Sequence, residues 1–165
     1  MITIRRIRIG EARLFSELRL AALKESPTAF LTTYESARQR SPESWSEQAN
    51  TTAAGRDRAT FFAFSDDLAV GIAAIYRDGE KTGDGELLQV WVAPEFRGGE
   101  VARPLLDTAL RWSEANGFRR VWARVTPGNE RALAFYRKCG FVAADASVRD
   151  PLGNEVLVRE ITGSE

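Results

Sequence analysis

The sequence contains no histidine and only one cysteine among its 165 residues. Without histidine, a zinc site of the usual kind and a nucleophile activated by histidine are both excluded, and we expect no metal. The single cysteine, Cys139, excludes an intramolecular disulfide and points to a reducing compartment. Any chemistry must therefore come from carboxylates, tyrosine, lysine, the thiol, backbone amides or a bound cofactor.

The formal net charge is zero, because 23 Lys and Arg residues balance 23 Asp and Glu residues. A nucleic-acid-binding protein would normally show a basic excess. No apolar run approaches the length that crosses a membrane, and the first residues lack the apolar region of a signal peptide. We therefore expect a cytoplasmic protein that binds neither nucleic acid nor membrane. Its length suits a single domain over residues 1–165.

Hydrophobic periodicity predicts a mixed α/β fold. Residues 86–92 show little polar alternation, as expected for a strand in the middle of a sheet that is covered on both faces. The order of the elements indicates a βαβ unit in the second half of the chain. Strands are predicted at 2–9, 59–64, 68–76, 86–92, 120–125, 141–144 and 155–161, and helices at 11–24, from 41 onward, at 101–115 and at 129–138.

The main chemical signal is the turn between the strand at 86–92 and the helix at 101–115. Residues 92–99 are Val-Ala-Pro-Glu-Phe-Arg-Gly-Gly. Unpaired amides at a helix start, together with the helix dipole, suit a phosphate, and Arg97 adds positive charge. The alternative interpretation is a plain connection whose glycines serve turn geometry only. The spacing matches neither a P-loop nor a dinucleotide-binding fingerprint.

The last predicted helix carries a second group of residues with chemical potential. Asn129 is a good N-cap candidate. Tyr136 is either an amphipathic core tyrosine or a general acid, since a phenol holds its proton at neutral pH. For Cys139 we favour a small buried hydrophobic role, because no histidine exists to activate it.

Together these two segments resemble the GNAT superfamily of acyl-CoA N-acyltransferases, in particular its bacterial members. Val92-x-Pro94-x-x-Arg97-Gly98 is similar to the pyrophosphate-binding motif of the family, and the stretch from Asn129 to Phe141 is similar to a second motif. The resemblance implies a central, splayed mixed β-sheet flanked by helices. It also implies acetyl-CoA as co-substrate and a small-molecule or peptide amine as acceptor, with a homodimer common in the family.

The resemblance also implies roles for individual residues. Tyr136 would be the general acid, and Glu86 is our candidate for the base, although a solvated strand-end carboxylate is an equally good interpretation. Weaker candidates for the base are Glu155, Tyr34 and Glu35. The acceptor would lie between residues 28–50 and the loops at 79–85 and 150–154. Implied cofactor-binding residues are Val90, Val92, Arg97, Gly98, Gly99, Val101, Ala102, Arg103 and Asn129.

One residue departs from the family pattern. Glu100 stands where the family usually has glycine, and its carboxylate could repel a diphosphate or could point to solvent. We hypothesise weakened but retained acetyl-CoA binding. The departure also motivates an alternative function, a non-catalytic acyl-CoA-binding module or degenerate homologue. A purely structural interaction protein, which would bind no CoA, is a third hypothesis.

Overall fold

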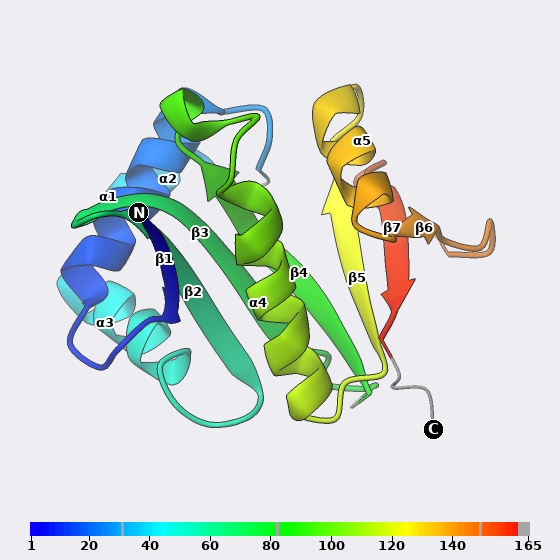
Figure 1. The fold of residues 1–165 in the computed structure, drawn as a ribbon, viewed down its shortest axis with the longest axis horizontal. Coiled ribbons are helices and arrows are strands. Elements are labelled where there is room, and N and C mark those ends of the chain that lie inside the picture. Colours follow the sequence, from blue (N-terminus) through cyan, green and yellow to red (C-terminus); the bar gives the residue numbers. More distant parts are fainter. Residues whose placement is uncertain (31, 82, 149, 162–165) are drawn as a thin grey trace.

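In the computed structural model, which describes residues 1–161 except 31, 82 and 149, a seven-stranded sheet is flanked by helices (Figure 1). The strand order is β1-β2-β3-β4-β5-β7-β6. The strands are β1 (Ile2–Arg6), β2 (Arg58–Ser65), β3 (Leu68–Arg77), β4 (Asp84–Val92), β5 (Arg120–Val125), β6 (Val142–Ala143) and β7 (Glu155–Glu160). The helices are α1 (Ala12–Glu25), α2 (Tyr34–Arg38), α3 (Pro42–Thr51), α4 (Ala102–Ala115) and α5 (Glu130–Lys138), with a 3-10 turn, η1, at Pro94–Phe96.

The predicted mixed sheet is confirmed, because β4 and β5 pair in parallel while the other neighbouring strands are antiparallel. Periodicity missed α2, whose five residues are too few to show a helical repeat. Its start is fixed instead by Thr33, whose side chain accepts a hydrogen bond from the Ser36 amide at 3.1 Å. β4 begins at Asp84, inside the segment that we expected to be a loop. No helix among the described residues combines the length and the apolarity needed to cross a membrane.

Each face of the sheet has its own hydrophobic core. The two phenylalanines Phe61 and Phe62 are adjacent in β2 and enter different clusters, as the alternation of a strand requires. α4 and α5 pack on one face, whereas α1 and α3 pack on the other (Figure 1). The central strands are therefore covered on both sides, in accord with the apolar sequence of β4.

β4 and β5 separate part-way along their length (Figure 1). Their pairing ends at Leu87 and Ala123, while β4 continues to Val92, still paired with β3. On the β3 side the register shifts by one residue, and Gln89 has a φ of 60°. An extra residue of this kind is a β-bulge, which bends the strand that carries it. The bulge and the lost pairing confirm the splayed sheet.

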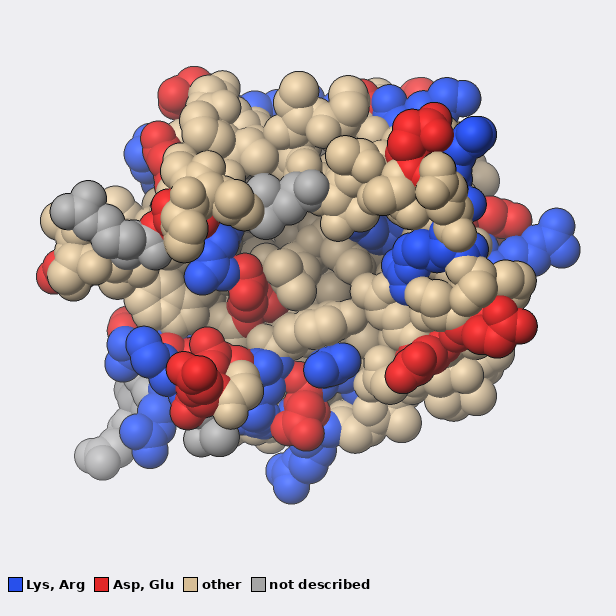
Figure 2. Space-filling model, turned by 180° about the vertical axis from the view of Figure 1, so that it is seen from behind, with Lys and Arg blue, Asp and Glu red and all other residues tan. Residues whose placement is uncertain are grey.

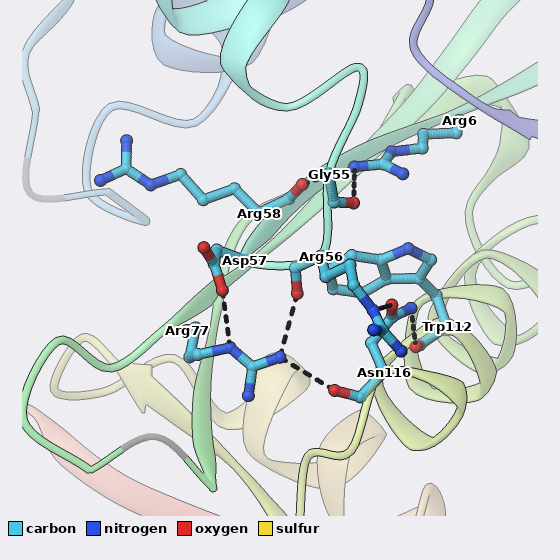
Figure 3. A network of polar contacts seen from close by, with 8 residues as sticks. All are labelled: Arg6, Gly55, Arg56, Asp57, Arg58, Arg77, Trp112 and Asn116. Atoms are coloured by element: carbon cyan, nitrogen blue, oxygen red, sulfur yellow. Dashed lines mark hydrogen bonds and ion pairs between the residues drawn. The ribbon is translucent and has the colours of Figure 1, made fainter.

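A network of polar contacts fixes the C-terminal end of α4 (Figure 3). The guanidinium of Arg77, on β3, donates to the carbonyl oxygens of Arg56 at 3.0 Å and of Asn116 at 2.9 Å, and to the carboxylate of Asp57 at 3.0 Å. These contacts tie the loop before β2 to the residue that ends α4. Because a helix is stiff, holding this end also sets where its N-terminus lies, beside the opening of the sheet.

Gly85 gives the first prediction. It pairs with Val121 at the root of the splay, and a Cβ placed on it would lie 2.5 Å from the ring of Phe118, which is only 3% exposed. We expect Gly85→Ala to lower the free energy of unfolding by about 1–3 kcal/mol, because the ring has no room to move. Gly79→Ala is the control, since nothing lies within 4 Å of a Cβ there. Equal urea midpoints for the two variants would contradict the packing described.

Candidate active site

Two adjoining cavities lie where β4 and β5 separate. The strand cavity, about 340 Å³, is lined by residues 86–90 of β4 and 124–126 at the end of β5. The turn cavity, about 440 Å³, is lined by Val92, Arg97, Gly98 and Ala102 and by the facing side of α5. Figure 2 shows the back of the molecule hollowed near its centre, mostly between uncharged residues with acidic and basic groups beside it. Both cavities are lined by Ala29, Phe30, Val90, Asn129, Ala132 and Tyr136.

The start of α4 leaves backbone donors available beside the turn cavity. No side chain caps this helix, whereas Asn129 caps α5 and Ser41 caps α3. The first amides of a helix have no intrahelical partner, and the helix dipole makes them attractive to an anion. Gly98, in the turn before, has a φ of 75°, which other residues rarely adopt. The arrangement suits a phosphate.

Arg97 lies in the wall of the turn cavity, but its guanidinium is already bonded. Its two terminal nitrogens donate to Glu25 at the end of α1, at 2.9 and 2.6 Å. Its Nε donates to the carbonyl of Val92 at 2.9 Å. The indole of Trp91 also donates to Glu25, at 2.9 Å. This Glu25–Arg97 clamp joins α1 to the turn, and the hydrogen bonds from Arg97 lower the pKa of Glu25 to about 2.

The backbone of β4 beyond the splay faces the opening. The amide of Ala93 donates to the carbonyl of Val70 at 2.8 Å, so Val92 directs its own polar backbone groups away from β3. The carbonyl of Val92 is used by Arg97, which leaves its amide as a donor toward the cavity. Val90 lines both cavities. The two valines are therefore brought to the site that the sequence indicated.

The remaining residues of the turn motif lie less close to the cavities. Among the described residues, Gly99, Val101 and Arg103 line neither cavity. Val101 is 1% exposed and packs in the core, so that only its backbone can face a ligand. Arg103 contacts Asp107 at 3.4 Å. Glu100 is exposed and also outside both cavity walls.

Two cations that sequence analysis did not single out line the turn cavity. They are Arg131 and Lys138, both on α5. Neither forms an ion pair with another residue that the structure describes. Their spacing of seven residues places them on one face of a helix, which is a signal that the sequence offered. These two side chains make the wall of this cavity basic, whereas the charge of Arg97 is paired with Glu25.

Tyr136 lies at the junction of the two cavities. It is 8% exposed, and burial raises the pKa of its phenol well above the usual value, so that it stays protonated at neutral pH. Its ring packs 5.4 Å from that of Phe141. Asn129 fixes the start of the same helix by accepting from the amide of Ala132 at 3.2 Å. Cys139, predicted to be a small buried hydrophobe, is buried at the end of this helix.

Glu86 lines the strand cavity and is hydrogen-bonded to Arg124, which lines the same cavity. The Nε of Arg124 also lies 3.8 Å from a carboxylate oxygen of Asp150. The weaker candidates for the base are elsewhere: among the described residues, Glu155, Tyr34 and Glu35 line neither cavity.

The model of the Acetyltransferase (GNAT) family matches residues 22–141. The chain belongs to this family. Among curated proteins, uncharacterized N-acetyltransferases of Mycobacterium tuberculosis and Mycobacterium bovis are each 34% identical to it over 84 residues. The aligned part is 51% of this chain and 53% of the relative, so the GNAT chain spans about half the length of the curated relatives it matches.

Solved structures of other acetyltransferases share the fold. A GNAT acetyltransferase from Streptococcus pneumoniae superimposes with a TM-score of 0.81 at 20% identity, covering 98% of this chain and 99% of that one. The PaiA N-acetyltransferase of Thermoplasma acidophilum, solved in complex with coenzyme A, gives a TM-score of 0.80 at 21% identity, covering 97% and 99%. Both support the splayed GNAT sheet described above.

The Glu25–Arg97 clamp predicts a pH-dependent contribution to stability. The pKa of Glu25 is about 2 in the folded protein, against 4.5 ordinarily. A lowered carboxyl pKa stabilises the fold fully above pH 4.5, and the contribution is lost as the pH falls toward 2. We expect Glu25→Gln to reduce the free energy of unfolding at pH 7 by about 1 kcal/mol, because the pair is partly solvated.

The measurement is urea unfolding of wild type and Glu25→Gln between pH 7 and pH 3. The difference between them should shrink steadily on acidification. Glu17→Gln is the control, since its partner Arg13 is almost fully exposed at 93% and the pair should contribute little. A difference that stays constant down to pH 3 would mean that the clamp does not hold Glu25 ionised.

Proposed function

We propose that this GNAT protein is an acyl-CoA-dependent N-acyltransferase that moves an acetyl group from acetyl-CoA to a primary amine. The observation that carries the proposal is Tyr136, a protonated phenol at the junction of two cavities in the splay of the sheet. One cavity adjoins an uncapped helix start and basic residues, and the other holds a carboxylate. Such a pair of cavities suits two substrates that meet at one point.

The residues of the turn cavity fit acetyl-CoA, which would supply an activated acyl thioester. The free amides at the start of α4 suit its diphosphate, with Arg131 and Lys138 adding positive charge. The amide of Val92 and the backbone of Val90 can pair with the amide groups of its pantetheine arm. Asn129 uses its side-chain oxygen as the helix cap, so its NH₂ group remains as a donor. The coenzyme A complex of the PaiA neighbour supports this assignment.

The reaction that these groups favour is direct transfer. The neutral amine nitrogen attacks the thioester carbon, a C–N bond forms and the C–S bond breaks. Tyr136 gives its proton to the departing thiolate and later recovers one from solvent. Binding both substrates side by side supplies much of the rate, because it removes the entropy cost of their encounter. No acyl-enzyme is needed, in keeping with a sequence that has no histidine to activate a nucleophile.

Glu86 is the proposed acceptor of the amine proton. It lines the strand cavity, on the side of Tyr136 where the amine would enter. Its hydrogen bond to Arg124 occupies part of the carboxylate, so we propose that a water molecule relays the proton to the remaining lone pairs.

Tyr136→Phe tests the role of the general acid. We expect kcat to fall by roughly 100-fold or more, because general-acid catalysis commonly contributes that much. The dissociation constant of acetyl-CoA should change less than about twofold, since the ring is kept. Free thiol release reports turnover, and calorimetry reports binding. Tyr34→Phe, outside both cavities, is the matched control.

If Tyr136→Phe turns over at the wild-type rate, the phenol is not the acid. If the wild type binds acetyl-CoA but no amine of a broad panel releases free CoA, the non-catalytic binding module replaces the enzyme as the better hypothesis.

Glu100→Gln tests the departure in the turn motif. The carboxylate is exposed and outside the wall of the turn cavity, so it can act on a diphosphate only over distance through solvent. We expect the change to tighten acetyl-CoA binding by about two- to fivefold at low ionic strength and by much less in 0.5 M salt. Calorimetric titration at the two salt concentrations measures both values. An affinity gain that salt does not reduce would point to a direct contact.

A further inference from the structure

Arg19, on α1, is a buried cation without a counter-ion. It is 6% exposed and lines the strand cavity. None of the residues that the structure describes accepts a hydrogen bond from its guanidinium or forms an ion pair with it, and its Nη1 is fully buried without a partner. A charge removed from water is ordinarily paired, because its desolvation is otherwise uncompensated. An unpaired arginine in a cavity wall therefore calls for a ligand.

The neighbours of Arg19 do not neutralise its positive charge. The ring of Phe30 lies 5.1 Å from the guanidinium carbon, which gives a favourable contact but no negative charge. Arg40 is a second cation nearby, and Tyr76 contributes only a phenol. Burial and Arg40 lower the pKa of Arg19 to about 10, so that it stays charged at neutral pH. The wall of the strand cavity therefore carries a positive charge at Arg19.

Among the described residues, one further polar atom of the same cavity wall is unpaired. It is the side-chain oxygen of Gln89, on the bulge of β4. Asn154, just before β7, lines the same cavity. The carboxylate of Glu86, by contrast, is already bonded to Arg124. The groups of this cavity that have no partner in the described part of the chain are thus one cation and one neutral hydrogen-bond acceptor.

We propose that the acceptor amine carries a carboxylate, as an amino acid does, and that Arg19 binds this group. The inference rests on the proposed function, since it names the class of the second substrate. A carboxylate matches the planar fork of a guanidinium, and its single negative charge matches the single positive charge of Arg19. The cavity, at about 340 Å³, has the size of a small-molecule site. The amine would then extend toward Tyr136, which lines the same cavity.

The competing explanation is that Arg19 is a structural residue, packed against Phe30. The two explanations predict opposite effects of Arg19→Met, which keeps the length of the side chain and removes the charge. If Arg19 binds a ligand, its unpaired charge lowers the stability of the ligand-free protein, so its removal should raise the melting temperature. A structural arginine would lower it on removal. Arg13→Met, on the exposed side of the same helix, controls for the loss of an arginine from α1.

The substrate experiment uses the twenty common amino acids, each beside its carboxamide, as acceptors in thiol release. We expect the wild type to prefer at least one amino acid over its carboxamide by roughly 100-fold or more in kcat/KM, because a site with a buried charged donor discriminates strongly. In Arg19→Met this ratio should collapse toward one. Phosphoethanolamine is added as an amine whose anion is a phosphate.

A second readout does not depend on turnover. Amino acids that bind should raise the melting temperature of the wild type, their carboxamides should not, and Arg19→Met should lose the response. If no amine releases CoA while this carboxylate-specific shift is present, the proposed reaction fails and the carboxylate site stands.

Three results would overturn the inference. They are equal use or equal binding of amino acids and carboxamides, a preference for phosphoethanolamine over every amino acid, and a lower melting temperature for Arg19→Met than for Arg13→Met.

Discussion

The parallel pairing of β4 with β5, and its end after four residue pairs, is the constraint on which the site depends. If the two strands stayed paired to Val92, the backbone of β4 would be consumed by the sheet and neither cavity would exist. The bulge at Gln89 keeps β4 bonded to β3 while bending it away from β5. β4 therefore stays paired with β3 while the opening forms on its other edge, and its far face still packs on the core beneath α1.

Two arginines at this opening show how differently the fold treats positive charge. Arg97 meets a carboxylate, a carbonyl and the edge of α1, and every one of these contacts holds the turn in place. Arg19 is more deeply buried, and no carboxylate in the described part of the chain pairs with it. The Glu25–Arg97 clamp shows that a carboxylate on α1 can pair with an arginine at this opening. Arg19 thus differs from Arg97 in having no ion-pair partner among the described residues. It lines the strand cavity, whereas the turn motif lies at the turn cavity.

The order of the elements could be predicted from the sequence because long amphipathic helices and apolar strands carry their periodicity with them. The motif around Arg97 and the helix from Asn129 could be predicted for the same reason, as local patterns. The role of the Arg97 side chain could not, since its partner Glu25 lies 72 residues away. Gln89 gave no signal, because a bulge depends on the register of two strands. The stretch from Leu18 to Phe30 resembles a pattern common in bacterial members of the family, but only the packing near Phe30 and Tyr76 shows that Arg19 is buried.

The absence of histidine shapes the proposed chemistry in a further way. Histidine is the side chain that ordinarily both accepts and donates a proton near neutral pH. In a protein without histidine, one residue must donate the proton and another must accept it. Tyr136 cannot take the proton of the amine, since burial keeps the phenol protonated. In the proposed reaction the proton of the amine leaves by another route, for which we proposed Glu86, held by Arg124 at the wall of the same cavity. Such a division works only if the amine arrives at the junction in a fixed orientation. A charged anchor in the wall of the same cavity, the role proposed for Arg19, is the simplest device that would give it one.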